Sequence, residues 1–117
     1  MAKHNELGAH GESLARKWLS DNGFYVLETN WRVGHLEIDI ICHKNNKLHI
    51  IEVKCRSGRR FGHPEQRVNK KKIKNMTAAG TSYMHQKNIR GWISYDILSI
   101  TLCADQPIEF LLIEDIY

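Results

Sequence analysis

The spacing of apolar residues near the start of the chain has the period of an amphipathic helix. Within residues 6–22, one helical face collects the apolar or small residues Leu7, Gly11, Leu14, Ala15, Trp18 and Leu19. Such a stripe predicts a helix that packs one side against a core. Gly23 follows as a helix end, because glycine readily takes the left-handed backbone conformation found there.

The pattern then changes to short runs that are rich in β-branched residues. Residues 24–28 predict a first strand, followed by a connection over residues 29–34. Residues 36–43 and 48–55 predict two longer strands on either side of the polar turn 44–47, and therefore an antiparallel hairpin. Both strands of this hairpin carry charged residues among their apolar ones.

A second helical pattern follows the hairpin. Pro64 suits the first turn of a helix that runs to about residue 86. The apolar stripe of this helix consists of Val68, Met76, Ala79 and Tyr83. Lys72 falls in the middle of the stripe, where a lysine must either extend outward to water or point at an anionic group. Residues 92–101 and 108–113 predict two further strands.

In chain order, these elements predict an α/β fold. The order α-β-β-β-α-β-β corresponds to a central mixed β-sheet flanked by helices. A length of 117 residues suffices for one hydrophobic core and is too short for two, so we expect a single domain over residues 1–117. The hydrophobic share of 42% and the charged share of 26% are those of a folded globular protein.

The composition also narrows the expected location of the protein. No apolar run approaches the roughly 20 residues needed to cross a bilayer, and the first residues lack the apolar segment of a secretory signal. We therefore expect a cytoplasmic protein with no membrane partner. The three cysteines Cys42, Cys55 and Cys103 have no CxxC spacing, which predicts reduced, mostly buried thiols and not a zinc site.

Charged side chains inside the two hairpin strands require an explanation. Burying a charge is costly unless the charge is paired or binds a metal. Alternate side chains of a strand share a face, so Glu37 and Asp39 point one way in the first strand, and Glu52 and Lys54 share a face in the second. If the hairpin register joins these faces, Asp39, Glu52 and Lys54 converge on one point, with Glu37 as an accessory residue.

These three residue types match the requirements of phosphodiester hydrolysis. Two carboxylates can hold Mg²⁺ or Mn²⁺ through oxygen ligands, and such an ion, when bound, activates water and polarises a phosphoryl oxygen. A lysine close by can orient that water or offset negative charge. We therefore take Asp39, Glu52 and Lys54 as candidate catalytic residues. The alternative is an ion-pair network that only orients the hairpin.

The formal charge of +4 is unevenly distributed along the chain. Residues 54–74 contain nine basic residues against one acidic residue, so this basic segment carries +8 and the rest of the chain −4. A basic segment next to carboxylates favours binding of a polyanion near a cation site, although a solvated surface is the alternative. The candidate nucleic-acid-binding residues are Arg56, Arg59, Arg60, Arg67, Lys70 and Lys72. Phe61 is the only aromatic residue in the segment, so base stacking on single strands finds little support there.

Four short segments carry a resemblance to a known family. They are Gly11-Glu12 with Ala15, Glu37-Ile38-Asp39-Ile40-Ile41, Ile51-Glu52-Val53-Lys54 with Arg56, and Tyr95-Asp96-Ile97. In combination these segments resemble the YraN family, small bacterial proteins assigned to the restriction-endonuclease-like PD-(D/E)XK superfamily. The resemblance spans nearly the whole chain and implies an αβββαβ core.

The resemblance also implies roles for individual residues. Asp39 and Glu52 match the metal-binding acids of the superfamily, and Lys54 matches its motif lysine. Glu12 matches the acidic residue on the first helix that many members add to the metal site, archaeal Holliday junction resolvases among them. Gln66 is an accessory candidate, because glutamines reach the site in some members.

Together, the residues and the resemblance predict a metal-dependent, endonuclease-like protein that acts on DNA phosphodiester bonds. Branched or recombination intermediates are the substrates suggested by analogy with the resolvases. A homodimer would suit duplex cleavage, since each site cuts one strand. The alternative is a non-catalytic nucleic-acid-binding adaptor that keeps the nuclease fold. A purely structural interaction domain would leave the basic segment unexplained.

Overall fold

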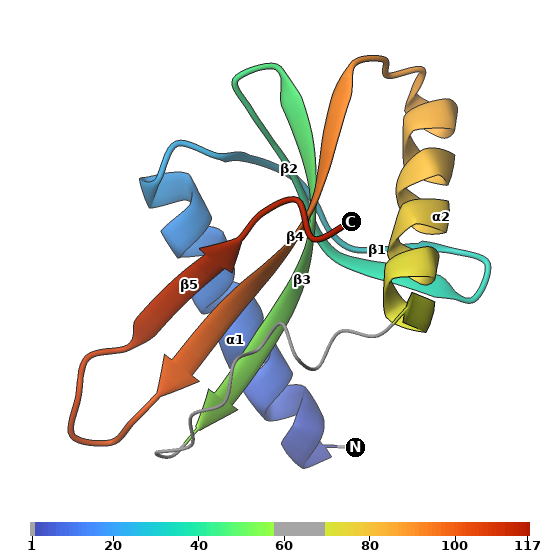
Figure 1. Ribbon diagram of the computed structural model, residues 1–117. Helices are drawn as coiled ribbons and strands as arrows, with labels where there is room; N and C mark the ends of the chain where they lie inside the picture. Colours follow the sequence, from blue (N-terminus) through green and yellow to red (C-terminus); the bar gives the residue numbers. More distant parts are fainter. Residues whose placement is uncertain (1, 58–69) are drawn as a thin grey trace.

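A five-stranded β-sheet with one helix on each face forms the body of the molecule in the computed structural model (Figure 1). The structure describes residues 2–57 and 70–117, with side chains for 10–57 and 70–117. The elements are α1 (Ala2–Asp21), β1 (Tyr25–Val33), β2 (Leu36–Lys44), β3 (Lys47–Ser57), α2 (Lys70–Lys87), β4 (Trp92–Leu102) and β5 (Glu109–Ile113).

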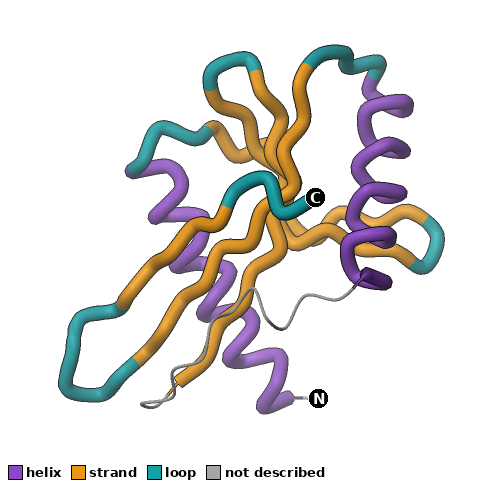
Figure 2. The backbone as a smooth tube through the Cα atoms, viewed as in Figure 1, coloured by secondary structure: helices purple, strands orange, loops and turns teal. Residues whose placement is uncertain are grey.

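The strands follow one another across the sheet in the order β1-β2-β3-β4-β5. The pairs β1–β2, β2–β3 and β4–β5 are antiparallel and are joined by short loops (Figure 2). The pair β3–β4 is parallel, and α2 lies within the crossover that parallel neighbours need. This arrangement confirms the predicted α/β sheet, the antiparallel hairpin and the αβββαβ core.

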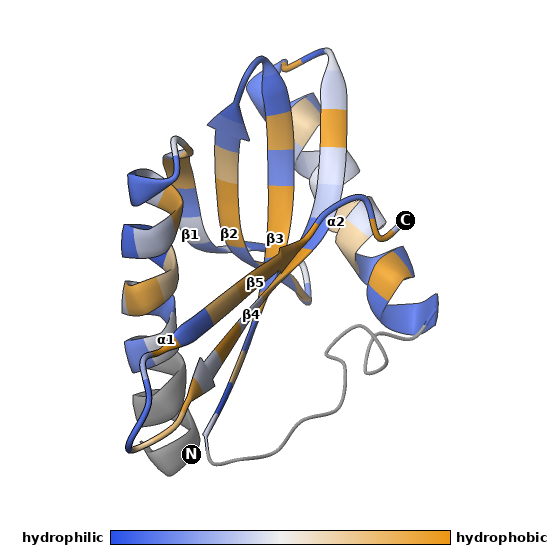
Figure 3. Ribbon diagram, turned by 60° about the vertical axis from the view of Figure 1, so that its left-hand side comes forward, coloured by the Kyte–Doolittle hydropathy of each residue, from blue (hydrophilic) through white to orange (hydrophobic). Residues whose placement is uncertain are grey.

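Two apolar clusters hold the helices against opposite faces of the sheet (Figure 3). On the α1 face, the cluster includes Ala15, Leu19, Ile40, Ile51 and Leu98. On the α2 face, it includes Ile41, Ile50, Met76, Ala79 and Tyr83. Neighbouring residues of β2 and of β3 therefore belong to different clusters, as the two-residue period of a strand requires. The predicted apolar stripes of both helices are confirmed where the structure describes them.

Each helix approaches the sheet closely at a glycine. A Cβ atom at Gly11 of α1 would lie 2.9 Å from Cβ of Cys55, and one at Gly80 of α2 would lie 2.9 Å from the ring of Tyr95. Both distances are too short for carbon atoms in contact, so a larger residue would push its helix away from the sheet. Gly11 therefore fixes the depth at which α1, with the neighbouring Glu12, lies on β3.

The connection predicted over residues 29–34 is wrong, because β1 continues to Val33. Trp31 and Val33 pair with Ile38 and Leu36, and all four side chains contribute to the α2-face cluster. Gly34, at a φ of 59°, provides the left-handed residue of the turn that follows. The helix start predicted at Pro64 and the stripe residue Val68 lie outside the described residues.

Composition led to expectations about the cysteines and about membrane-crossing segments. None of the three cysteines forms a disulfide in the described part of the chain; Cys42 is buried, and Cys55 and Cys103 are partly buried. Within the part of the chain that the structure describes, no helix combines the length and the apolar character needed to cross a membrane.

Candidate functional site

The candidate site lies where strands β2 and β3 separate. Their pairing ends at Ile40 and Ile51, so Asp39 and Glu52 occupy the next opposed positions, beyond the end of the ladder. From there β3 continues along β4, whereas β2 continues along β1. Oδ2 of Asp39 accepts a hydrogen bond of 2.8 Å from the backbone N–H of Val53. A side-chain carboxylate thus takes the place of the lost strand-to-strand hydrogen bond and holds the fork open.

The acidic residues of both strands face one cavity below α2. The cavity has a volume of about 220 Å³ and is lined by His35, Leu36, Glu37, Asp39, Glu52, Lys72, Asn75 and Met76. The predicted convergence of Asp39 with Glu52 on one face is therefore confirmed, and so is the shared face of Glu37 and Asp39. The cavity is also lined by residues of α2. The alternation of residues along the two strands does not predict these residues, because their position depends on how the helix crosses the fork.

Asp39 has an environment that opposes its negative charge. Burial, reinforced by the neighbouring carboxylate of Glu52, raises the pKa of Asp39 from 3.8 to about 6. The Val53 hydrogen bond and the ammonium of Lys72 act in the opposite direction, while Glu37 adds to the increase. The fork therefore concentrates negative charge that a cation would stabilise.

Glu52 faces two lysines across the site. Its Oε2 lies 3.1 Å from Nζ of Lys72 and 3.9 Å from Nζ of Lys54, and its side chain is only 14% exposed. Lys72 was expected either to extend outward to water or to point at an anionic group. The structure shows the second arrangement, because its ammonium points at the carboxylate of Glu52. The three predicted residues Asp39, Glu52 and Lys54 thus belong to one group, which α2 extends by Lys72.

Glu12 lies apart from this group in its contacts. Its Oε1 accepts a hydrogen bond of 2.8 Å from Nδ2 of Asn30, and its Oε2 lies 4.0 Å from Nε of Arg16. Among the described residues, no three or more His, Cys, Asp or Glu side chains are gathered so that they could hold a metal ion. The carboxylates that the structure does bring together are those of Asp39 and Glu52, with Glu37 on the same cavity.

Three further predicted residues, Glu37, Arg56 and Lys70, lie on three different elements. Glu37 lies 3.6 Å from Arg32 of the neighbouring strand, measured from Oε2 to Nη2, so its charge is already partly offset. Arg56 lies two residues beyond Lys54 on β3 and is partly buried, whereas Lys70 is the exposed first residue of α2. The other predicted residues lie outside the described residues; they are Arg59, Arg60, Gln66 and Arg67.

Two asparagines at the site were not predicted from the sequence. Asn75 lines the cavity one helical turn after Lys72, and this three-residue spacing is a signal that could have identified it. Asn30, the partner of Glu12, has a φ of 51° in the left-handed region. Its contact joins β1 to α1 across 18 positions of sequence, and no local pattern indicates such a contact.

A second polar cluster lies on the α1 face, away from the fork. Asp96 of β4 is fully buried, and its Oδ2 lies 2.7 Å from Nδ1 of His49. Its Oδ1 accepts hydrogen bonds from the hydroxyl of Ser94 and, at 3.2 Å, from the backbone N–H of Asp115. These contacts tie β3, β4 and the segment after β5 together, which identifies Asp96 as a structural carboxylate.

Fold and site together define a class of protein. An αβββαβ core that carries an aspartate at the end of one hairpin strand and a Glu-x-Lys triplet on the next has the architecture of the restriction-endonuclease-like fold. Within this class, the chain belongs to the uncharacterised protein family UPF0102, the YraN family, whose model matches residues 11–100.

Relatives from several bacteria support this membership. The chain is 42% identical to the UPF0102 protein of Bacteroides thetaiotaomicron and 38% identical to that of Phocaeicola vulgatus, in each case over 86% of this chain and 83% of the relative. It is 41% identical to the UPF0102 protein of Flavobacterium psychrophilum over 86% of this chain and 84% of the relative. Because family and fold do not by themselves define a reaction, the function is argued from the site.

Proposed function

We propose that this protein is a metal-dependent nuclease that acts on DNA phosphodiester bonds. The observation that carries the proposal is the position of Asp39 and Glu52 at the fork of β2 and β3, with Lys54 and Lys72 next to Glu52. Opposed carboxylates at diverging strand ends leave space in front of them, and here this space is the cavity below α2.

The residues at the fork fit a divalent cation. Asp39 and Glu52 offer carboxylate oxygens, the donors that Mg²⁺ and Mn²⁺ prefer. Burial and the neighbouring carboxylate of Glu52 raise the pKa of Asp39, and an added positive charge would offset both effects. When bound, such a cation lowers the pKa of a water ligand and polarises a phosphoryl oxygen. Glu12, which contacts Asn30 and Arg16 in the structure, would complete the site from α1 directly or through water.

The basic side chains have complementary tasks in this proposal. Lys54, on the same strand face as Glu52, orients the attacking water or stabilises charge that develops on the phosphate. Lys72 is held at the cavity by Glu52 and binds a phosphate next to the scissile bond. Lys70 and Arg56 extend this positive surface on α2 and β3.

The proposed substrate is DNA, including branched or recombining forms, and a homodimer would place one site on each strand of a duplex. The support is the +8 charge of residues 54–74, which continue from β3 of the site into α2. Attraction of this kind acts on the phosphate backbone and does not depend on base sequence.

Cleavage assays with matched variants test the proposal. We expect DNA cleavage that requires Mg²⁺ or Mn²⁺ and falls by at least about a hundredfold in Asp39→Asn, Glu52→Gln and Lys54→Ala, because each change removes a charge from the site. Salt-sensitive DNA binding should persist in all three variants. Asp21→Asn and Lys17→Ala are controls of the same chemical type, since these two residues form an exposed ion pair on α1. Cleavage that survives the site variants would refute the proposal.

One observation favours the non-catalytic adaptor as a second candidate. Glu52 is accompanied by two ammonium groups, and a carboxylate whose charge is met in this way needs no metal ion. The adaptor would bind DNA with the same salt dependence and would cleave no form of it. Binding without cleavage on duplex, single-stranded and branched DNA, with either cation present, would therefore decide for the adaptor.

A further inference from the structure

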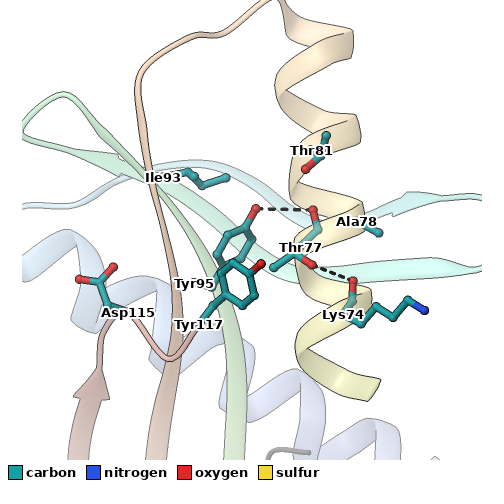
Figure 4. Close-up of a pocket in the computed structure, with 8 residues that line it drawn as sticks. All are labelled: Lys74, Thr77, Ala78, Thr81, Ile93, Tyr95, Asp115 and Tyr117. Carbon is teal, nitrogen blue, oxygen red and sulfur yellow. Dashed lines mark hydrogen bonds between the residues drawn. The ribbon is translucent and has the colours of Figure 1, made fainter. Parts of the chain in front are cut away.

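We propose that a groove on the other side of α2 from the fork binds an unpaired nucleobase of the DNA. The inference rests on the proposed nucleic-acid function and goes beyond it, because it names the structural feature of DNA that the protein recognises. The groove lies between α2, β4 and the segment after β5, and Figure 4 shows its lining residues.

The groove is open to solvent and large enough for a nucleotide. Its volume is about 670 Å³, and its lining includes Lys74, Thr77, Thr81, Tyr95, Asp115 and Tyr117. Aromatic rings and hydroxyl groups line this space, and the ammonium group of Lys74 extends from α2 away from the two tyrosines (Figure 4). A base requires a ring to stack on and polar groups at its edge, and a phosphate requires a cation.

Tyr117 supplies the stacking surface. Its side chain is 79% exposed, although it lies against Tyr95, with ring centroids 5.9 Å apart and planes at 83°. Tyr95 is buried, and its hydroxyl lies 3.5 Å from the carbonyl oxygen of Thr77 on α2. Tyr95 therefore forms a fixed wall, while one face of Tyr117 remains available to a base.

The charges around the groove favour a nucleotide over a neutral ligand. Lys74 lies at its edge and is exposed. The carboxylate of Asp115 has its own partners, Nζ of Lys47 at 3.6 Å and the hydroxyl of Ser94 at 2.9 Å, so its repulsion of a phosphate is reduced. To bind the phosphate of a nucleotide stacked on Tyr117, the exposed side chain of Lys74 would turn toward the groove.

Helix α2 contributes residues to both the groove and the fork. Lys72 reaches Glu52 on one side of α2, and Lys74 lines the groove on the other. The two sites are thus separated by little more than the width of a helix, about 10–12 Å with side chains. A strand whose phosphate is held at Lys72 can therefore deliver a base to Tyr117 within a few nucleotides.

The basic segment contains only Phe61 as an aromatic residue. The aromatic rings of the groove belong to other parts of the chain. Tyr95 and Tyr117 come from β4 and from the segment after β5, and both line the groove that Lys74 also lines. Asp115 and Tyr117 lie beyond the residues 11–100 that match the family model. Base recognition is therefore proposed for this chain, and not for the family as a whole.

Fluorescence measurements without divalent cations test the proposal in the absence of cleavage. The probes are a fully paired DNA duplex and the same duplex with one unpaired 2-aminopurine. We expect Tyr117→Ala to weaken binding of the second duplex about tenfold and to abolish the fluorescence change of its 2-aminopurine, with a change below about twofold for the paired duplex. Tyr117→Phe should bind as the wild type does, because it keeps the ring. Tyr25→Ala is the matched control, since Tyr25 is also exposed, at 68%, and lies at the start of β1.

Several outcomes would overturn the inference. Equal weakening of both duplexes by Tyr117→Ala, loss of binding in Tyr117→Phe, or absence of DNA binding in the wild type would each do so. A dimer in sedimentation that dissociates in Tyr117→Ala would assign the groove to a second copy of the chain. Normal cleavage at the fork together with an unchanged 2-aminopurine signal would refute base recognition alone. Preference for the unpaired base without any cleavage would instead refute the nuclease proposal alone.

Discussion

Two aspartates of this sheet, the partly buried Asp39 and the fully buried Asp96, have different neighbours. Asp96 accepts hydrogen bonds from Ser94 and the backbone of Asp115 and lies against the ring of His49. Asp39 accepts a hydrogen bond from the backbone of Val53 but faces other carboxylates across a cavity.

The neighbours of Asp96 are those of a structural carboxylate, whereas the neighbours of Asp39 leave its carboxylate open to a cation. Hydrogen-bond donors around a buried carboxylate offset the loss of water, so Asp96 stabilises the contact between strands. Burial, reinforced by the neighbouring carboxylates of Glu52 and Glu37, raises the pKa of Asp39 to about 6. The surroundings of Asp39 favour an added cation, whereas those of Asp96 already complete its interactions.

The largest effect is expected from removing the structural carboxylate. Asp96→Ala leaves His49, Ser94 and the N–H of Asp115 without their buried acceptor, which should lower the free energy of unfolding by about 3–5 kcal/mol. Urea denaturation measures this change. Asp21→Ala, which removes a carboxylate that is 61% exposed, should stay within about 0.5 kcal/mol of the wild type. Similar values for both variants would contradict the structural role of Asp96.

Replacing the carboxylate of Asp39 at the fork is expected to raise the free energy of unfolding instead of lowering it. Because the pKa of Asp39 is raised to about 6 in the folded protein, the folded state binds more protons than the unfolded state between about pH 4 and pH 6. The contribution of Asp39 to stability therefore falls as the pH rises through this window. Asp39→Asn keeps an oxygen for the Val53 N–H and should be more stable than the wild type by about 1–3 kcal/mol near pH 8.

This gain should disappear below about pH 4, where Asp39 is protonated in both states. Urea denaturation at the two pH values provides the test. A variant that is less stable than the wild type near pH 8 would show that the charge of Asp39 is compensated within the protein.

The smallest change in the free energy of unfolding is expected from binding of a divalent cation. Mg²⁺ or Mn²⁺ at ten times its dissociation constant should raise the stability of the wild type by about 1.4 kcal/mol, because only the folded protein has the assembled site. The increase should be absent in Asp39→Asn and retained in Asp21→Asn, as followed by thermal unfolding. Equal stabilisation of both variants would place the cation elsewhere on the protein.

Local patterns predicted which side chains of one element share a face at the cavity. The two-residue period of a strand put Glu37 with Asp39 and Glu52 with Lys54, and the helical period put Lys72 in an apolar stripe. Each of these predictions concerns side chains of one element, whose directions follow from backbone geometry alone. The prediction for residues 29–34 failed because Trp31 and Val33 extend the strand by pairing with Ile38 and Leu36, and the pattern within residues 29–34 does not indicate this pairing.

The sequence by itself determined the order of elements, the apolar faces, the concentration of basic charge and the charged residues of the hairpin. Only the tertiary structure decided that Lys72 meets Glu52, that Asn30 binds Glu12, and that Tyr117 lies against Tyr95. The reason is physical: periodicity fixes directions within an element, whereas contacts between elements depend on how the helices pack against the two faces of the sheet.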